Sequence, residues 1–314
     1  MPIYYILGTV AVLLLLILLT SLICFYMAFY SKSRRELGQD EYEIPPGRIY
    51  EPFRERMIEW IKQMRTLPHE DVSIVSHDGL TLWGRYYEYR KGATVELLFH
   101  GYRGNSERDL CGAVDRCFSL GRNALIVDQR ASGKSDGHVI SFGINERKDC
   151  LRWIDYAIER FGSDVKLIIT GISMGAATVM MAAGEKLPPN VVSVLADCGY
   201  TTPKEIICEV MRQMHLPAWL LYPFIRLGGW LFGHFDLEET SATEAMARCK
   251  IPVIFYHGDA DDFVPCDMSR RLYELCPTTK RLVLVPSAGH GLAFPMDEES
   301  YLRELREFEA EYEG

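Results

Sequence analysis

The sequence predicts an α/β fold, in which a mostly parallel, doubly wound sheet carries helices on both faces. Three observations support it. An antiparallel hairpin is expected first, strands and helices then alternate, and one strand ends at a glycine-flanked serine that opens a helix. We also expect one transmembrane helix before this domain and one helical cap inserted into it.

The first element is an apolar helix. The segment Ile6–Met27 is almost wholly apolar, and no charged residue occurs from Met1 to Ser31. About 20 such residues span a bilayer core. A cleavable signal peptide is the alternative, but this run is longer than a signal's apolar region and lacks a basic segment before it. The sequence therefore predicts a transmembrane anchor over residues 1–31.

The charges beside this helix predict its orientation. Lys32, Arg34 and Arg35 follow it, and positive charge favours the cytosolic side, so we expect a cytosolic catalytic domain. The nine cysteines include no C-x-x-C pair, which suits reduced thiols and gives no zinc site. The net charge of −9 argues against a nucleic-acid partner. We expect neither a metal nor a cofactor.

Residues 32–70 are expected to form a linker and an amphipathic helix. Ser33–Arg48 is rich in charge, proline and glycine. A helix is then predicted over about Glu51–Arg65, because apolar residues recur at helical spacing. These residues are Phe53, Met57, Trp60, Ile61 and Met64. The stripe favours docking on the domain, with contact to a membrane surface as the alternative.

The α/β-fold domain is expected over residues 71–314. Its hairpin pairs Val72–Ser76 with Leu80–Tyr87 across an Asp-Gly turn. The further strands are expected at Val95–Phe99, Ala124–Val127, Leu167–Thr170, Val191–Leu195, Val253–Tyr256 and Leu282–Val285. The helices are expected at Ser106–Leu120, Asn145–Arg160, Met174–Glu185, Asp267–Leu275 and Glu298–Glu311.

One segment interrupts this alternation. About fifty residues, Thr201–Lys250, separate two predicted strands where one helix would suffice, and they are rich in large apolar side chains. We expect a helical cap over the carboxyl ends of the strands, where open α/β sheets place their sites. The choice of substrate is then expected to depend on this cap.

The glycine-flanked serine is the predicted nucleophile. In Gly171–Ala177 an apolar strand meets a helix at Ser173, and the two glycines allow a sharp turn with close backbone contact. The start of that helix directs backbone N–H groups toward a developing oxyanion. The arrangement predicts a nucleophile elbow.

A serine nucleophile requires a base and a group that orients the base. His290 follows the predicted strand Arg281–Pro286. Asp259, Asp261 and Asp262 follow the strand Ile251–Tyr256, and spacing alone does not choose among them. The order serine, aspartate, histidine is the one expected for an α/β-hydrolase.

Two backbone N–H groups are candidates for an oxyanion hole. Met174 directly follows the nucleophile, and Tyr102 lies in the glycine-containing loop His100–Asn105 after a predicted strand. Each such donor contributes a few kcal/mol to the transition state. His100 precedes the turn, and we expect it to brace the loop by hydrogen bonding.

These motifs together resemble the α/β-hydrolase superfamily of serine hydrolases. The resemblance covers roughly Asp71 to the C-terminus and includes four ordered patterns, H-G-x-x-G-N, D-x-R-x-x-G-x-S, G-x-S-M-G and H-G-x-x-D-x-x-V-P. The fifth residue of the last pattern is the triad member in this family, which selects Asp261. The chain is similar to membrane-anchored or secreted firmicute hydrolases and to eukaryotic acyl-ester and thioester hydrolases, a branch with peptidase-like members.

The expected function is that of a membrane-anchored serine hydrolase with the triad Ser173, His290 and Asp261. An apolar cap and a bilayer anchor would both suit an amphiphilic substrate, which favours a medium to long acyl ester or thioester. The alternatives are a peptidase that cleaves short peptides and a non-catalytic scaffold with the same fold. A peptidase would show acidic or polar pocket residues that bind a peptide amine.

Overall fold

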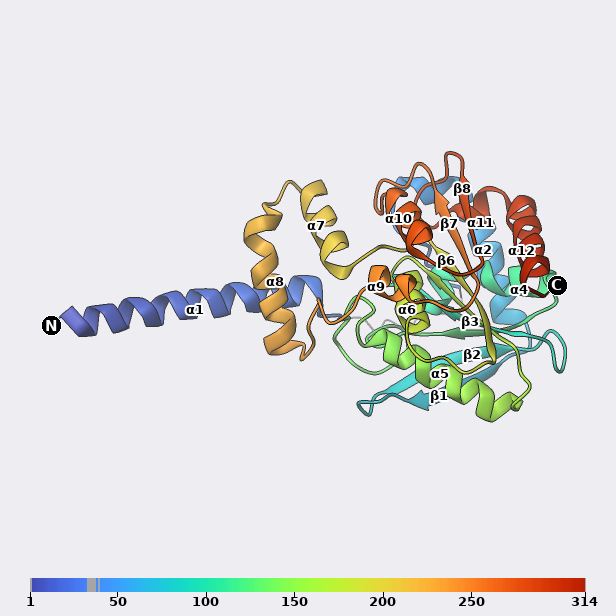
Figure 1. Ribbon diagram of the computed structural model, residues 1–314, viewed down its shortest axis with the longest axis horizontal. Coiled ribbons are helices and arrows are strands. Elements are labelled where there is room, and N and C mark those ends of the chain that lie inside the picture. The colour runs from blue at the N-terminus through green and yellow to red at the C-terminus, as the bar shows by residue number, and fades with distance from the viewer. Residues whose placement is uncertain (1, 33–37, 39, 314) are drawn as a thin grey trace.

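The computed structural model describes residues 2–32, 38 and 40–313, and its centre is one eight-stranded sheet (Figure 1). The strand order is β1-β2-β4-β3-β5-β6-β7-β8. β1 pairs antiparallel with β2, β2 pairs antiparallel with β4, and all other pairs are parallel. The strands are β1 Glu70–Val75, β2 Thr81–Tyr87, β3 Val95–Phe99, β4 Asn123–Val127, β5 Leu167–Ile172, β6 Val191–Asp197, β7 Val253–Gly258 and β8 Lys280–Val285. The predicted α/β fold is confirmed.

Helices cover both faces of the sheet. The central strands β3 and β4 are buried along their whole length, as expected of parallel strands between helical layers. The helices are α1 Pro2–Ala28, α2 Arg54–Thr66, α3 Ser106–Asp109, α4 Ala113–Ser119, α5 Glu146–Phe161, α6 Met174–Ala183, α7 Pro203–Gln213, α8 Ala218–Phe232, α9 Ala242–Ala247, α10 Asp267–Leu275, α11 Ala293–Met296 and α12 Glu298–Glu313, with a 3-10 helix η1 over Arg48–Phe53. One apolar core includes residues of α5, α6, α9 and α10, and a second includes residues of α2, α4 and α12.

The helix expected over Ser106–Leu120 is two helices, α3 and α4. The chain turns between them, and Gly112 caps α4. A Cβ added at Gly112 would lie 3.0 Å from the ring of Phe294 and 3.1 Å from the ring of Trp60. The turn brings the backbone directly against these two rings. Helix propensities read along the sequence do not reveal such a tertiary contact.

Helix α1 is a candidate membrane span. Ile3–Ala28 is long and apolar enough to cross a bilayer, and only 6% of its most apolar stretch of 18 residues is buried. Its carboxyl end is fixed to the domain, because the Ser31 N–H donates to His138 and the Ile140 N–H donates to Phe29. Of the three basic residues expected to set the orientation, Arg34 and Arg35 lie outside the described residues.

The amphipathic helix docks on the domain, as the stripe favoured. Met57, Trp60, Ile61 and Met64 of α2 are each at most 3% exposed. The Trp60 ring stacks on Phe294, with ring centroids 5.4 Å apart. The burial of this whole face fixes the N-terminal segment on the same side of the sheet as α4 and α12.

The insertion between β6 and β7 contains α7, α8 and α9. Helix α9 packs against α6, whereas α8 crosses α1 beside the domain (Figure 1). Gly228 of α8 approaches α1 so closely that an added Cβ would lie 2.5 Å from the Ser21 carbonyl oxygen. One face of α8 thus meets the N-terminal helix, an arrangement that we did not expect from the sequence.

Candidate active site

Ser173 occupies a sharp turn between β5 and α6. Its φ of 56° and ψ of −117° lie in a region that non-glycine residues rarely adopt, a strain typical of functional sites. A Cβ added at Gly171 would lie 2.1 Å from the Gly175 backbone, and one added at Gly175 would lie 2.1 Å from the Phe99 carbonyl oxygen. Both glycines are therefore required by close backbone contact, which explains the motif locally.

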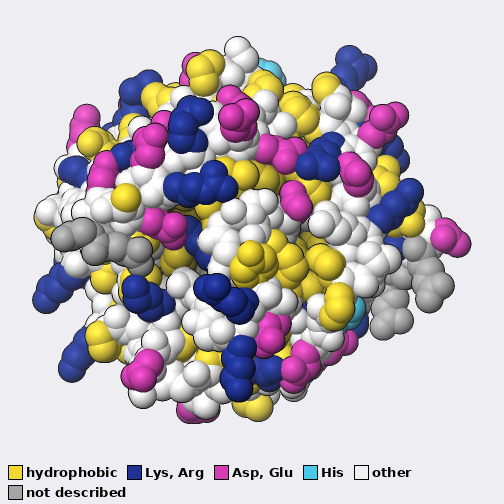
Figure 2. All heavy atoms as spheres, turned by 90° about the vertical axis from the view of Figure 1, so that its right-hand side faces the viewer, with side chains coloured by type: hydrophobic (Ala, Val, Ile, Leu, Met, Phe, Trp, Pro, Cys, Tyr) yellow, Lys and Arg dark blue, Asp and Glu magenta, His cyan; other side chains and the backbone are white. Residues whose placement is uncertain are grey.

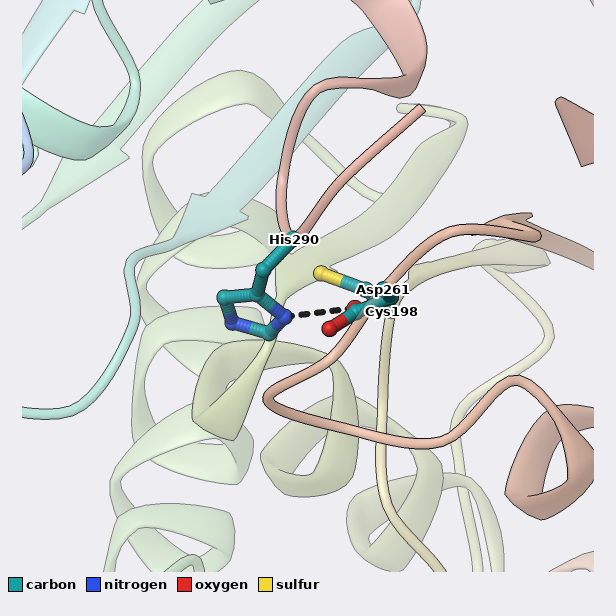
Figure 3. A group of neighbouring side chains, drawn as sticks. All are labelled: Cys198, Asp261 and His290. Carbon is teal, nitrogen blue, oxygen red and sulfur yellow. Dashed lines mark hydrogen bonds and ion pairs between the residues drawn. The ribbon is translucent and has the colours of Figure 1, made fainter. Parts of the chain in front are cut away.

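The structure brings Ser173, His290 and Asp261 into one hydrogen-bonded chain. His290 Nε2 lies 2.9 Å from Ser173 Oγ, and His290 Nδ1 lies 2.7 Å from Asp261 Oδ2. Figure 3 shows the bond between His290 and Asp261. Because an ionised carboxylate only accepts hydrogen bonds, Nδ1 carries the imidazole proton. Nε2 is then free to accept the hydroxyl proton of Ser173.

The three aspartates of the loop after β7 have different partners. Asp261 Oδ1 accepts from the N–H groups of Phe263 (2.9 Å) and Val264 (2.8 Å), while Oδ2 faces His290. Asp259 accepts from the Ser287 N–H at 2.6 Å and so braces the neighbouring loop. The Asp262 side chain is exposed. Of the three carboxylates, Asp261 is the one hydrogen-bonded to the imidazole.

The surroundings of Asp261 keep it ionised. Burial raises its pKa, but hydrogen bonds from His257 and His290 and from the Val264 N–H outweigh burial, so its pKa lies well below the ordinary value. His257 is fully buried, and its Nε2 lies 3.2 Å from Asp261 Oδ2 and 2.8 Å from the Val264 carbonyl oxygen. His257 opens the pattern H-G-x-x-D-x-x-V-P, but the sequence predicted no role for it.

The loop after β3 lies against the nucleophile. A Cβ added at Gly101 would be 3.8 Å from Ser173 Oγ. His100 braces this loop as expected, because its Nε2 accepts from the Gln129 N–H at 3.0 Å and its Nδ1 contacts the Gly101 carbonyl at 2.7 Å. The Tyr102 hydroxyl donates to the Ala28 carbonyl at 2.7 Å and so connects the loop to α1.

Met174 is the first residue of α6, so its N–H group is among those at the helix start that lack an intrahelical partner. The oxyanion roles of Tyr102 and Met174 remain predictions. Their placement is consistent with that role, since one residue follows the nucleophile and the other lies in the loop beside it.

A pocket of about 520 Å³ opens beside Ser173 and His290. Much of its wall is apolar, and much of it comes from the N-terminal segment and from α2, α4 and α11. The apolar and aromatic lining residues include Ile49, Tyr50, Met57, Trp60, Leu98, Cys111, Ile172 and Phe294. None of the lining residues comes from the insertion at 201–250. The insertion that we expected to cover the site and to select the substrate therefore contributes no wall to this pocket, because its helix α8 packs on α1.

Tyr50 is a further residue that the sequence did not indicate. Its side chain is 9% exposed, and its hydroxyl donates to the His290 carbonyl at 2.9 Å. It thereby holds the histidine loop against the N-terminal segment. No local motif surrounds Tyr50, so only the tertiary contact reveals this role.

Asp197, at the end of β6, also lines the pocket. Its Oδ2 accepts from the Tyr301 hydroxyl at 3.1 Å, while its buried Oδ1 has no hydrogen-bond partner among the described residues. Burial raises the pKa of this carboxyl group. The pocket therefore contains one buried acidic group with a free acceptor position.

Two groups of side chains in the described residues could hold a cation by geometry. Cys198, Asp261 and His290 lie together in Figure 3, but the imidazole and the carboxylate are already bonded to each other. Burial also raises the pKa of the Cys198 thiol, so it keeps its proton and is a poor ligand.

The second group is His77, Asp78 and Asp149. The Arg130 guanidinium ion-pairs with both of its carboxylates, at 2.9 Å and 2.6 Å. Because this cation already balances them, the arrangement is one of structural ion pairs.

Comparison with known proteins supports the fold. A protein-family model described as the alpha/beta hydrolase fold matches residues 97–228. The uncharacterized protein YqkD of Bacillus subtilis is 28% identical over 190 residues, which are 60% of this chain and 62% of YqkD, just under two thirds of its length. Protein bem46 of Schizosaccharomyces pombe is 27% identical over 189 residues, 59% of this chain and 57% of that protein.

Solved structures give the same result. An esterase of Pyrococcus furiosus, Pf2001, superposes with a TM-score of 0.67 at 19% identity, covering 91% of this chain and 99% of the esterase. Est1E of Butyrivibrio proteoclasticus, with ferulic acid bound, gives a TM-score of 0.58 at 20% identity, covering 77% of this chain and 98% of Est1E. The chain has the α/β-hydrolase fold, which confirms the resemblance drawn from its motifs.

Proposed function

We propose that this protein is a membrane-anchored serine hydrolase that cleaves acyl esters or thioesters through an acyl-enzyme. One observation carries the proposal. Ser173, His290 and Asp261 form a continuous hydrogen-bonded chain at the mouth of a largely apolar pocket. A nucleophile, its base and the group that orients the base are the parts that acyl transfer requires.

The reaction follows from the protonation states. His290 Nε2 takes the hydroxyl proton as Ser173 Oγ attacks the acyl carbonyl carbon, and Asp261 stabilises the imidazolium that forms. His290 then gives that proton to the leaving alcohol or thiol as the carbon–oxygen or carbon–sulfur bond breaks. A water molecule, deprotonated by His290, then attacks the acyl carbon of the acyl-enzyme. The bond between that carbon and Ser173 Oγ breaks, His290 returns the proton to Ser173 Oγ, and the acid is released. The N–H groups of Tyr102 and Met174 bind the oxyanion in both steps.

The pocket favours an acyl chain as the group held beside Ser173. Its volume lies within the range of small-ligand sites, and its aromatic and aliphatic walls bury apolar surface at about 25 cal/mol per Å². Trp60 and Phe294 stack on each other and give this wall a fixed shape. We therefore infer that the N-terminal segment and α2 select the acyl group.

The peptidase alternative keeps one supporting observation. Asp197 lines the pocket and has a free Oδ1, as expected of a group that binds a peptide amine. Its raised pKa weakens this argument, since a neutral carboxyl group attracts an ammonium less strongly. The scaffold alternative is disfavoured, because the hydrogen-bonded chain at Ser173 serves no evident structural purpose.

The membrane location rests on α1, with the catalytic domain on the cytosolic side. A yeast relative from Saccharomyces cerevisiae, 23% identical over 230 residues, is described as a membrane protein. All nine cysteines are free thiols, which suits a reducing compartment. Cys208 and Cys266 are partly exposed and can report the orientation. Labelling of these two cysteines by an impermeant thiol reagent in intact cells would refute a cytosolic domain.

The test of the reaction is a substrate series on the full-length protein in detergent. Nitrophenyl esters and acyl thioesters of increasing chain length are compared with aminoacyl anilides, using Ser173→Ala as the control. Turnover of esters or thioesters that rises with chain length and disappears in Ser173→Ala is expected. Amide turnover equal to ester turnover would favour the peptidase, and no turnover of any substrate by folded protein would overturn the hydrolase.

A further inference from the structure

Helix α8 presents large apolar side chains to the outside. Trp219 is 81% exposed, Trp230 is 62% exposed and Leu220 is 45% exposed. The two tryptophans are eleven residues apart, which is about three helical turns, so they lie on the same face of the helix. Large apolar residues clustered on one exposed face indicate an interaction surface.

The opposite side of α8 is fixed to α1. Beyond the contact between Gly228 and Ser21, the ring centroids of Phe232 and Phe25 lie 5.8 Å apart, and Gly229 faces the Phe29 ring. Small residues that let two backbones approach closely are typical of helix contacts in membranes. Since the end of α1 is hydrogen-bonded to the domain, α8 also has a fixed place along α1.

That place can be located along the membrane normal. Ile3–Leu19 is exposed at every residue, and these roughly 17 residues span about 26 Å at 1.5 Å per residue. The hydrocarbon core of a bilayer is about 30 Å thick. If Ile3 lies at one edge of the core, the other edge falls within about three residues of Leu19. The crossing with α8, at Ser21 and Phe25, therefore lies at the boundary between acyl chains and headgroups.

We propose that α8 lies in this boundary as a second membrane contact, with Trp219 and Trp230 among the headgroups of the leaflet next to the catalytic domain. The inference rests on the proposed function only in that α1 is the anchor. Tryptophan is enriched at this depth, because its ring is apolar and its N–H group is polar. The face of the molecule turned away from α1 has intermingled acidic and basic side chains (Figure 2), as expected of a surface in water.

The charges of this region are compatible with the interface. Arg226 of α8 forms two hydrogen bonds with Asp236, at 3.0 Å and 2.9 Å, and an ion pair with Glu238 at 2.5 Å. Lys204 lies 3.3 Å from the same glutamate. A paired arginine with a partly exposed side chain can reach the headgroups while its stem stays near the acyl chains. The bilayer therefore fits this surface without leaving Arg226 unpaired.

The experiment is depth-dependent quenching of tryptophan fluorescence in the full-length protein reconstituted into phosphatidylcholine vesicles. Lipids brominated near the headgroup and near the bilayer centre are compared. The double variant Trp219→Phe/Trp230→Phe is the test, and Trp83→Phe is the matched control, since Trp83 lies on β2. Vesicle flotation shows retention of the protein, and hydrolysis of a short soluble ester shows that each variant is folded.

We expect the wild type and Trp83→Phe to be quenched more by the shallow bromines, and the double variant to lose most of that quenching. Equal quenching in the wild type and the double variant, with the protein retained on vesicles, would overturn the membrane contact of α8 and leave the α1 anchor standing. A dimer in detergent with no quenching would assign the face to a second copy of the chain and also overturn the proposal. Loss from the vesicles would contradict the anchor too, while the ester assay tests the hydrolase separately.

Discussion

The substitution Asp261→Asn tests the orientation of His290 most sharply. Asp261 Oδ1 accepts from the Phe263 and Val264 N–H groups, and Oδ2 accepts from His290 Nδ1. Placing the amide NH2 at the Oδ1 position would set donors against two backbone donors. The NH2 group therefore takes the Oδ2 position, where it faces the imidazole.

Donation from this amide NH2 group to Nδ1 forces His290 into the tautomer that has its proton on Nε2. That nitrogen can then no longer accept the hydroxyl proton of Ser173. Loss of the correct tautomer in a serine triad lowers kcat by about 10⁴, equivalent to about 5.5 kcal/mol. We expect a loss of this size for Asp261→Asn in steady-state ester hydrolysis.

Two neighbours provide matched controls in the same loop. Asp259→Asn and Asp262→Asn remove one charge each without contact to the imidazole, so their kcat should stay within about tenfold of the wild type. Circular dichroism and thermal melting show whether each variant is folded. Folded Asp261→Asn with kcat within tenfold of the wild type, or equal losses in all three variants, would refute the reasoning.

Three further outcomes are expected. Ile49→Asp, in the pocket wall, should shift ester preference toward short acyl chains. Leu216→Asp, in the insertion, is the control and should leave the preference unchanged, since Ile49 and Leu216 are similarly exposed, at 38% and 37%. Equal chain-length profiles for the two variants would contradict this. Glu96→Gln removes the carboxylate that pairs with the buried Arg116 and leaves Arg122 paired with Glu309 alone. It should lower the free energy of unfolding by about 3–5 kcal/mol in urea titration, and a change below about 1 kcal/mol would contradict this. Burial raises the pKa of Glu96, but Arg116 and Arg122 outweigh it and lower the pKa to about 2, so its stabilisation is present above pH 4.5 and is lost as the pH falls toward 2. The wild type should lose about 3 kcal/mol more than Glu96→Gln over that interval, and parallel pH profiles would contradict the coupling.

The nucleophile region was predictable because its causes are local. Gly171 and Gly175 are required by contacts within the strand, turn and helix that contain them, or with the adjacent strand β3. The strands were likewise predictable, since short runs of mostly apolar residues alternate with helical patterns. Their carboxyl ends meet at one edge of a parallel sheet, which brings His290 and Asp261 to Ser173.

The acid and the pocket wall depend on tertiary structure. Asp259, Asp261 and Asp262 have the same chemistry and near-equal spacing, and only the folded loop distinguishes them. The stripe containing Met57 and Trp60 showed which face of α2 is buried. It could not show that this helix and Tyr50 would build the wall beside the nucleophile.

The insertion shows the same limit. Its many large apolar residues led us to expect burial against the carboxyl ends of the strands. In the structure α8 packs on α1 instead. Gly228 allows the close approach to Ser21, because a larger residue at that position would hold the two helices apart. A glycine pair within a helical pattern signals such a contact but does not name the partner.

The central claim is that Ser173 is the nucleophile, and covalent labelling tests it most directly. The full-length protein in detergent is treated with a fluorophosphonate, and the adduct is located by peptide mass spectrometry. The account predicts about one adduct per chain, on Ser173, absent in Ser173→Ala and formed far more slowly in Asp261→Asn. Folded wild-type protein that remains unlabelled, or an adduct on a different residue, would contradict it.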